Sequence, residues 1–226
     1  MSNYIDRTLS LIGKEQFERN TKKHILIIGL GGVGGTALET LYRSGFMKFT
    51  LVDSDIVDET NLNRQIMYSR VDVGSYKTDV CKSKIFEFCK DIDVKTINIH
   101  VDETNIENLF KQPVDVVIDA IDFIPGKIAI YDYCLKNNIP FISSLGMAKR
   151  LNPELVKITT LAKTENDPLA KKIRYECRQR NLDLKKIPVV FSSEEPIDTG
   201  NELGSMMPVP SMAGLLLAKY IITLEK

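Results

Sequence analysis

Short apolar runs bounded by turn residues alternate along most of the chain with longer stretches of helical spacing. The runs cover residues 25–28, 49–52, 94–99, 114–121 and 140–143. Runs of this length are typical of strands that are buried on both faces, and strands that alternate with helices form right-handed βαβ units. The pattern therefore predicts an α/β fold with a doubly wound, mostly parallel sheet between two helical layers.

The alternation of strands and helices that is typical of a parallel sheet breaks down beyond residue 151. Two further apolar runs, 155–161 and 187–192, flank a charged helix predicted from about Pro168 to Arg180. Asp167 is its expected N-cap, because an acceptor side chain followed by proline is typical of a helix start. We expect these elements to form an antiparallel extension of the same sheet. A loop over 194–210 and a last helix from Ser211 onward complete the prediction.

Length and composition favour one domain. With 226 residues and 43% hydrophobic content, the chain can build one sizeable core, whereas two domains would each have a thin one. We expect a nucleotide-binding core over 1–150 and a substrate-side extension over 151–226. Lys plus Arg and Asp plus Glu both number 30, so any nucleic-acid partner must bind a local patch.

The cysteines and the apolar segments predict a cytoplasmic protein without a membrane partner. No two of the four cysteines are spaced as C-x-x-C, so neither a structural zinc site nor a thioredoxin-like motif is supported, and reduced thiols are expected. The N-terminus lacks the apolar stretch of a signal peptide. The longest apolar segment, 213–222, is shorter than the roughly 20 residues of a membrane span and contains Lys219.

A glycine-rich turn follows the first predicted strand. Gly29, Gly31 and Gly34 form G-x-G-x-x-G, with Gly32 inside the same loop, and Asp53 ends the second strand. The first glycine permits a tight turn, the second lets the backbone approach phosphate, and the third packs helix on strand. A carboxylate at the second strand accepts hydrogen bonds from ribose. Although any tight βα turn favours glycine, this context favours a Rossmann-like nucleotide site.

The next residues help to decide between NAD, FAD and ATP. Asn61, Arg64 and Gln65 follow the second strand, and Lys77 begins the next helix. Fixed cations and amides that face a helix N-terminus suit a triphosphate, whereas a nicotinamide has no need of them. A surface ion pair for Arg64 and a solvated helix start for Lys77 are the ordinary alternatives, each plausible alone and less so together.

Acidic residues end the strand predicted over 114–121. Asp122 follows it at the edge where ligands bind in open α/β sheets, and one carboxylate there can hold Mg²⁺ together with waters. Asp119 lies within the strand and is expected to be structural, although a supporting role behind the site stays open. His24 and His100 are expected to be structural rather than catalytic.

These motifs together resemble one family. G-L-G-G-V-G, V-D-S-D, T-N-L-N-R-Q, G-S-Y-K and D-A-I-D are similar to the ubiquitin-activating-enzyme-like adenylyltransferases over about residues 4–144. The resemblance implies that the glycine loop, Asp53 and Asp55 bind ATP, that Arg64 and Lys77 contact phosphates, and that Asp122 binds Mg²⁺. It also implies a homodimer in which Arg7, acting as a catalytic residue, reaches into the site of the partner subunit.

The second half narrows the resemblance. A-K-T-E-N-D-P-L-A-K-K-I-R, V-V-F-S-S-E-E-P and G-S-M-M-P-V-P-S-M-A-G resemble the tRNA threonylcarbamoyladenosine dehydratases. That branch implies ATP-dependent ring closure of the threonylcarbamoyl group next to the anticodon, by activation of its carboxylate. An acyl-adenylate is the expected intermediate, and an acyl phosphate stays open. The alternative is an adenylyltransferase that activates the C-terminus of a sulfur-carrier or ubiquitin-like protein; a sulfur-relay partner also stays open.

The segment 163–186 is the expected contact with tRNA. It holds eight cations against four carboxylates, an excess of four positive charges, which would make RNA binding strongly salt-dependent. A solvated helix with internal ion pairs explains the charge pattern equally well. Cys177 on this helix is a conceivable nucleophile for a sulfur carrier, but an incidental helical cysteine is the simpler interpretation. Cys81, Ile85 and Cys89 are expected to form one buried helical stripe.

Overall fold

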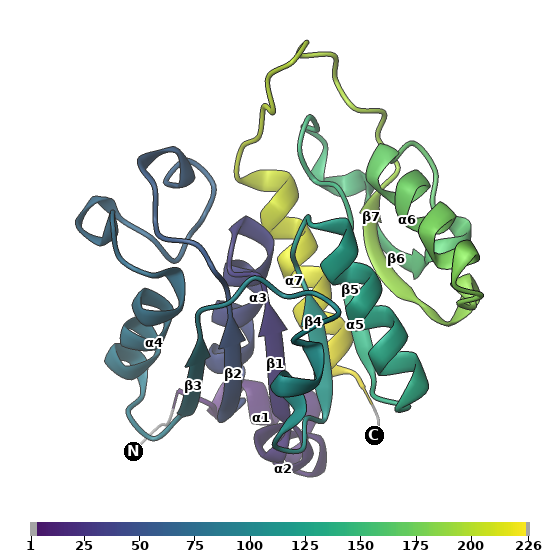
Figure 1. Cartoon of the computed structure of the whole chain (residues 1–226). Helices are drawn as coiled ribbons and strands as arrows, with labels where there is room; N and C mark the ends of the chain where they lie inside the picture. Colours follow the sequence, from purple (N-terminus) through teal and green to yellow (C-terminus); the bar gives the residue numbers. More distant parts are fainter. Residues whose placement is uncertain (1–3, 225–226) are drawn as a thin grey trace.

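The structure, a computed structural model, describes residues 4–224 (Figure 1). Its strands are β1 His24–Ile28, β2 Lys48–Val52, β3 Asp93–Ile97, β4 Val116–Asp119, β5 Phe141–Ser144, β6 Val156–Thr160 and β7 Pro188–Ser192. Its α-helices are α1 Asp6–Ile12, α2 Lys14–Lys22, α3 Gly32–Arg43, α4 Lys77–Phe88, α5 Ile124–Lys136, α6 Pro168–Gln179 and α7 Pro208–Ile222. Short 3₁₀ turns, among them η3 Ile106–Phe110, η5 Leu161–Lys163 and η6 Leu184–Lys186, connect them.

All seven strands form one sheet in the order β3-β2-β1-β4-β5-β7-β6. Neighbouring strands from β3 to β7 are parallel, with registers such as Ile28↔Val52 and Ile28↔Asp119. The order reverses between β1 and β4, because the chain builds outward first to β3 and then, from β4, in the other direction. The doubly wound, mostly parallel sheet predicted from the apolar runs is confirmed.

The predicted antiparallel extension is confirmed, and the structure shows which of its strands is reversed. Only β6 is antiparallel, paired with β7 from Val156↔Ser192 to Thr160↔Pro188. Strand β7 is parallel to β5 through Ser143↔Val189 and Ser144↔Val190, so it continues the parallel sheet and separates β5 from β6. The 27 residues between β6 and β7, which include α6, give the chain the length to cross back and enter beside β5.

The two faces of the sheet bury two separate hydrophobic clusters. Along β1, Ile25 and Ile27 face α3, α4 and α7, whereas Leu26 and Ile28 face α5, α6 and η3. This division follows from the two-residue period of side chains in a strand. Because β1 is covered on both faces, all five of its residues are buried, which explains why residues 25–28 are continuously apolar.

Helix α7 packs directly on α3 (Figure 1). A Cβ added at Gly214 would lie 2.5 Å from the carbonyl oxygen of Val33, so this glycine permits the close approach of the two helices. The helix begins at Pro208, three residues before the predicted start at Ser211, because proline is well suited to a first helical turn. The predicted charged helix is confirmed as α6, with Asp167 accepting a hydrogen bond from the backbone N–H of Ala170 at 3.0 Å.

Helices α1 and α2 lie at the amino-terminal edge of the sheet (Figure 1). His24 begins β1 near them, and its ring contacts the Pro113 carbonyl at 2.7 Å and the Thr50 hydroxyl at 2.8 Å, as expected for a structural histidine. Among residues 4–224, no helix is long and apolar enough to cross a membrane.

Candidate functional site: a cleft at the point where strand order reverses

The carboxyl ends of β1, β2, β4 and β5 surround a cleft of about 510 Å³. The cleft opens between β1 and β4, where neighbouring connections run to opposite faces of the sheet and leave space above the strands. Its volume lies within the usual range for small-molecule sites. The predicted site residues that line it are Gly29, Gly31, Gly32, Asp53, Asp55, Asn61, Arg64, Gln65, Lys77 and Asp122.

The turn after β1 is held on both sides by hydrogen bonds to Leu30. The Leu30 N–H donates to Asp53 Oδ2 at 2.6 Å, and the Leu30 carbonyl accepts from the buried Tyr68 hydroxyl at 2.8 Å. Gly29 has a φ of 91°, and a Cβ there would lie 2.7 Å from the Ala120 carbonyl. The conformation therefore requires glycine. Tyr68, which the sequence analysis did not single out, thus fixes the loop at the cleft.

The second glycine leaves room for a ligand. A Cβ built on Gly31 would meet only the Gln65 Nε2 atom, at 3.9 Å, so the space above it is open to the cleft. Gly31 is also the N-cap of α3, and no side chain caps that helix. The first-turn N–H groups and the positive end of the helix dipole are therefore available to an anion.

Gly34 does not line the cleft. A Cβ there would lie 1.9 Å from the Gly29 carbonyl oxygen, so Gly34 allows α3 to pack on the turn after β1. This is the packing role that the motif requires of its third glycine, and a contact of Gly34 with the nucleotide stays a prediction.

Asp53 directly follows β2, and both of its carboxylate oxygens accept hydrogen bonds from backbone. Oδ2 accepts from Leu30 and Oδ1 accepts from the Asp55 N–H at 2.8 Å. Burial raises the pKa of Asp53 above its usual value, and the charge of Lys77 together with these hydrogen bonds offsets part of the rise. The carboxylate joins the glycine turn to β2 and still faces the cleft.

Lys77 and Asp55 form an ion pair on one wall of the cleft. The Lys77 ammonium lies 2.7 Å from Asp55 Oδ2, and the Lys77 N–H donates to the Asp55 carbonyl at 3.0 Å. The two side chains differ in exposure, 6% for Lys77 and 62% for Asp55. The lysine is therefore held in place by the protein, whereas its acidic partner remains open to solvent. The alternative of a merely solvated helix start for Lys77 is wrong.

Arg64 and its neighbours form the adjoining wall. Arg64 Nη1 donates to the Thr60 carbonyl at 2.8 Å and to Asn63 Oδ1 at 3.0 Å, so its guanidinium is oriented without a carboxylate partner in the described part of the chain. Gln65 is buried, and its Oε1 atom has no hydrogen-bond partner within residues 4–224. An unpartnered buried acceptor next to open space is a suitable contact for a hydroxyl or amino group of a ligand.

Asp122 lies three residues beyond the end of β4 and lines the cleft. It is exposed, and no hydrogen bond or ion pair engages its carboxylate among residues 4–224. No group of three or more metal-binding side chains occurs in the same residues. A single free carboxylate fits Mg²⁺, which commonly binds one or two carboxylates together with phosphate oxygens and water.

Beneath the cleft lies a fully buried network that joins β4, β5 and α5. The Lys127 ammonium donates to Asp119 Oδ2 at 2.8 Å, to the Ser143 hydroxyl at 3.0 Å and to the Ser144 carbonyl at 2.6 Å. The Ser143 hydroxyl donates to Asp119 at 2.6 Å and contacts the Tyr131 hydroxyl at 2.6 Å. Asp119 is thus structural and directly supports the cleft floor. Lys127 was missed, because a lysine one turn into a predicted helix gives no signal of burial.

The loop after β5 forms the remaining wall, with Gly146, Met147 and Ala148 lining the cleft. The buried Arg150 guanidinium holds this loop by donating to its backbone carbonyls and, at 3.0 Å, to that of Asn166. Gly146 in turn donates its N–H to Asp167, the N-cap of α6, at 3.1 Å. Residues of the extension, Asn166 and Asp167, thus help to hold this wall, and no short motif in the sequence predicts these contacts.

The histidine and cysteine predictions have mixed outcomes. His100 lies beyond the end of β3 and lines the cleft, its ring 4.3 Å from that of Phe123, so it is not a buried structural residue. Cys81 and Ile85 are fully buried, but Cys89 is half-buried and follows the end of α4. Cys177 is fully buried, and burial raises the pKa of its thiol to about 12.

Arg7 lies away from the cleft of its own chain. It is exposed on α1, at the amino-terminal edge of the sheet, whereas the cleft lies at the carboxyl-terminal edge (Figure 1). No part of the described structure brings it to the other site residues. Any role for Arg7 in catalysis requires a second copy of the chain.

The fold and the cleft together define an α/β protein of the nucleotide-binding class, with a glycine turn and a helix N-terminus at the cleft. The chain belongs to the ThiF family, whose profile matches residues 5–224. A tRNA threonylcarbamoyladenosine dehydratase of Bacillus subtilis is 36% identical over 98% of this chain and 94% of its own. The ATP complex of the dehydratase TcdA of Escherichia coli superposes with a TM-score of 0.92 at 31% identity, covering 97% of this chain and 92% of that one. A probable molybdopterin-synthase adenylyltransferase of Porphyra purpurea is 37% identical over 58% of this chain and 34% of its own.

Proposed function

We propose that this protein uses ATP to close the threonylcarbamoyl group of a modified adenosine in tRNA into a ring, with loss of water. The observation that carries the proposal is the cleft itself, where an uncapped helix N-terminus faces fixed cations and a free carboxylate. The relatives support it, because they are named dehydratases of this substrate and share nearly the full length of the chain.

Some residues of the cleft bind the ribose of ATP, and others bind its phosphates. Asp53 accepts hydrogen bonds from ribose, and the glycine turn approaches the phosphates through Gly31. Arg64 and Lys77 neutralise the charge that develops on phosphorus as the carboxylate attacks. Asp122 would hold Mg²⁺, and the ion would supply positive charge to stabilise the phosphates.

The substrate carboxylate is itself the nucleophile, so the cleft needs no serine or cysteine. One carboxylate oxygen attacks the α-phosphorus of ATP and pyrophosphate leaves, which gives a mixed anhydride with AMP. The neighbouring carbamoyl group attacks the activated carbonyl, loses a proton and expels AMP, so one carboxylate oxygen departs on AMP. The protein contributes position and charge neutralisation to both steps.

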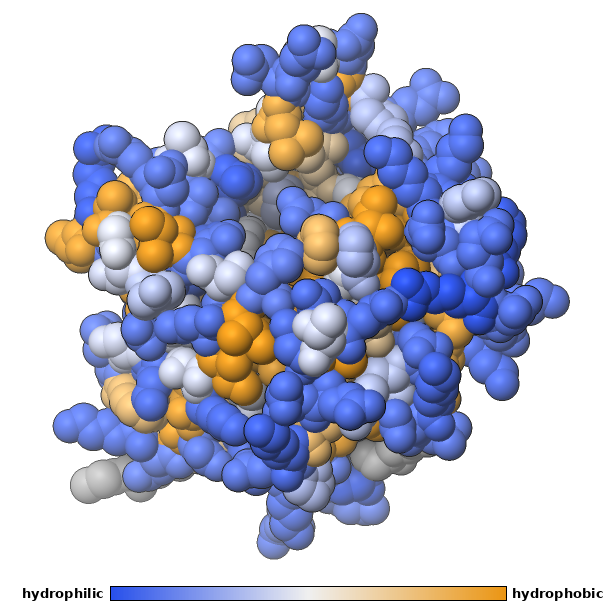
Figure 2. Space-filling model, viewed as in Figure 1, coloured by the Kyte–Doolittle hydropathy of each residue, from blue (hydrophilic) through white to orange (hydrophobic). Residues whose placement is uncertain are grey.

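A homodimer with Arg7 acting across the interface belongs to the same proposal. The connection between β2 and α4 exposes four apolar side chains, those of Ile56, Ile66, Val71 and Val73. Apolar surface is visible at the left of Figure 2. On α1, close to Arg7, Leu11 is 85% exposed. Exposed apolar side chains on both segments are typical of an interface that a second copy covers.

The sulfur-carrier alternative receives no support from the cysteines. Of the four thiols, three are fully buried and only Cys89 is partly accessible, at the end of α4 away from the cleft. A covalent carrier mechanism would need a thiol at the cleft. A sulfur-relay partner and a cytoplasmic location remain predictions, as does the division into a core and an extension of one domain.

The deciding experiment offers threonylcarbamoylated tRNA with ATP and Mg²⁺ and analyses the digested nucleosides by mass spectrometry. We expect a nucleoside lighter by one water, and AMP with pyrophosphate as the nucleotide products. If ADP and phosphate are found instead, the intermediate is an acyl phosphate and not an adenylate. Failure to form the ring under conditions in which ATP binds would refute the proposal, and pyrophosphate exchange that depends on a carrier protein would establish the alternative.

A homodimer test mixes two inactive variants. Arg7→Ala and Asp122→Ala should each abolish turnover, and their mixture should regain part of it, because mixed dimers contain one site with both residues intact. Absence of any rescue in dimers shown to exchange subunits would remove Arg7 from the mechanism.

A further inference from the structure

The outer face of α6 carries an unpaired basic stripe interrupted by one aromatic side chain. Lys171, Tyr175 and Arg178 follow one another at spacings of four and three, so they share one face of the helix, with Lys172 beside them. All four are exposed, and Ala170, Ile173 and Cys177 on the opposite side are fully buried. We call Lys171, Lys172, Tyr175 and Arg178 the basic stripe.

The cations of the stripe have no carboxylate partner within residues 4–224. The ion pairs that the described residues form nearby are Lys157–Glu165 and Arg180–Glu103, and neither includes a residue of the stripe. Asp167 is buried as the helix N-cap, and Asp183 caps the η6 turn, so two of the four acids of the segment already have backbone partners. The internal ion pairs that could have explained this charge pattern are therefore absent from the described structure, and a net positive face remains.

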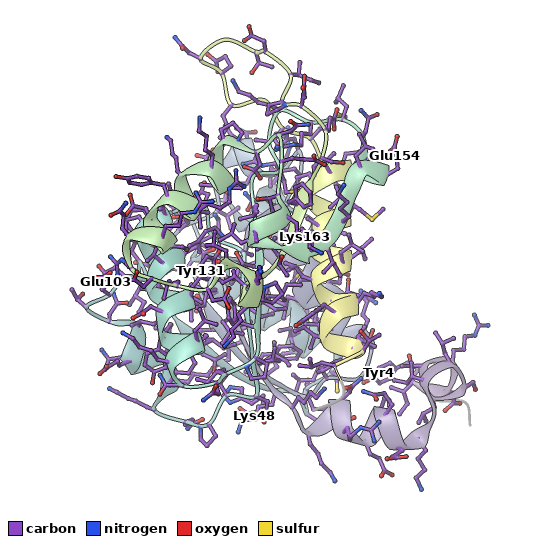
Figure 3. All side chains as sticks on the ribbon, turned by 90° about the vertical axis from the view of Figure 1, so that its right-hand side faces the viewer. Tyr4, Lys48, Glu103, Tyr131, Glu154 and Lys163 are labelled. Carbon is purple, nitrogen blue, oxygen red and sulfur yellow. The ribbon has the colours of Figure 1, made fainter. Side chains whose placement is uncertain are left out.

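Within α6, the ring of Tyr175 is the one large apolar side chain that is exposed. Hydrophilic side chains dominate the right-hand side of Figure 2, and Figure 3 views that side directly, with Lys163 near its centre and Glu103 at its margin. Tyr175 is 60% exposed, and no ring contact engages it among the described residues. An aromatic ring set among exposed cations is the arrangement on which unpaired nucleic-acid bases stack while their phosphates bind the cations.

The helix that carries the stripe begins at the cleft. Leu169, in the first turn of α6, lines the cleft, and the Asp167 N-cap is bonded to the cleft wall at Gly146. Tyr175 follows Leu169 by six residues, which is about 9 Å along a helix axis. The stripe is therefore within reach of the nucleotides adjacent to one that occupies the cleft.

We infer that the basic stripe is the docking surface for a single-stranded RNA loop, with Tyr175 stacking on an unpaired base adjacent to the nucleotide that enters the cleft. This inference rests on the proposed function, because the proposed tRNA substrate is what identifies the ligand as an RNA loop. RNA is favoured over an acidic protein because the stripe combines charge with an exposed ring and adjoins the site of a nucleotide substrate.

The test measures RNA binding separately from turnover. The probe is an unmodified anticodon stem-loop RNA with a fluorescent label, titrated with the full chain over a series of salt concentrations. Tyr175→Ala should weaken binding about 5- to 150-fold, whereas Tyr175→Phe and Tyr175→Trp should retain it, because stacking needs the ring and not the hydroxyl. The triple variant Lys171→Ala/Lys172→Ala/Arg178→Ala should weaken binding and flatten its salt dependence, by about one unit of slope for each phosphate that the variant no longer neutralises.

A matched control removes two other exposed cations. Lys90 and Lys111 lie in connections that precede β3 and β4, at the edge of the sheet opposite the cleft. Lys90→Ala/Lys111→Ala should leave the affinity for the stem-loop and the thermal midpoint unchanged, and binding of ATP should stay constant in every variant.

The outcomes separate this inference from the proposed function. Parental affinity in the triple variant, or an equal loss in the control pair, overturns the stripe as a docking surface. Equal losses for Tyr175→Ala and Tyr175→Phe overturn the stacking role. A wild-type protein that binds the stem-loop through the stripe but never closes the ring refutes the proposed function while leaving the stripe in place.

Discussion

Two aspartate–lysine pairs flank the cleft, and they differ in how much of each is buried. In the pair beneath the floor, Lys127 and Asp119, both side chains are completely inaccessible. In the pair on the wall, Lys77 is 6% exposed and Asp55 is 62% exposed. The distances are nearly the same, 2.8 Å and 2.7 Å, so geometry alone does not distinguish them.

The two ammonium groups differ in how many hydrogen-bond acceptors surround them, and therefore in what they can bind. All three donors of Lys127 are used, by Asp119, Ser143 and Ser144, so this lysine can only hold the ends of β4 and β5 together. Lys77 has one side-chain acceptor, Asp55, and its remaining donors face the cleft. A buried pair in which every group is satisfied supports the site, whereas a half-open pair is available to a ligand.

Removing the buried lysine should have the largest effect. Lys127→Met leaves the Asp119 carboxylate buried without its counter-charge, and we expect a loss of about 3–5 kcal/mol in the free energy of unfolding. Urea unfolding followed by circular dichroism measures it.

The control variant removes both charges of the pair, so that no buried charge is left without its partner. Lys127→Met/Asp119→Asn removes both charges, so it should recover a large part of the stability lost in the single variant. A loss below about 1 kcal/mol in the single variant, or no recovery in the double variant, would show that the buried pair is not the element that holds the two strands.

Removing the half-open lysine should have a smaller effect on stability and a large one on turnover. Lys77→Met leaves Asp55 solvated, so the free energy of unfolding should change by at most about 1 kcal/mol. Turnover should fall about 100- to 1,000-fold, because one fixed donor to the reacting phosphates is lost. Single-turnover kinetics and urea unfolding on the same preparation test both expectations. Turnover close to wild type would return Lys77 to a structural role.

The smallest effect is expected in the pH dependence of stability. Burial raises the pKa of Asp53, so the folded state binds this proton more tightly than the unfolded state. The contribution of Asp53 to stability is therefore complete below the usual carboxyl pKa and declines as pH rises through the raised value. The unfolding free energy of the wild type minus that of Asp53→Asn should decrease over this interval, and an increase would contradict the raised pKa.

Much of the cleft was predictable from sequence because its residues directly follow strands. Gly29 after β1, Asp53 after β2 and Asp122 after β4 were brought to one edge by the parallel order that the apolar runs indicate. Each of these residues lies next to the strand that positions it, so a short sequence motif is enough to identify it. The fold class followed from the same runs.

The remaining features depend on packing between distant segments. Strand β7 inserts beside β5 through only two paired positions, which no local pattern specifies. Lys127 resembles an ordinary helical lysine until β4 and β5 surround it. Tyr68 supports the glycine turn across 38 positions of sequence, so its role becomes visible only in three dimensions.

The insertion of β7 also limits how the chain can be divided. A fragment ending near residue 150 would keep the glycine turn but leave the β5 residues Ser143 and Ser144 without their neighbours Val189 and Val190. Their backbone groups would become an open sheet edge with an apolar flank, a common template for aggregation. The nucleotide-binding half is therefore a poor candidate for separate expression. Chimaeras with related proteins should have their junctions at exposed loop tips and not between the two halves.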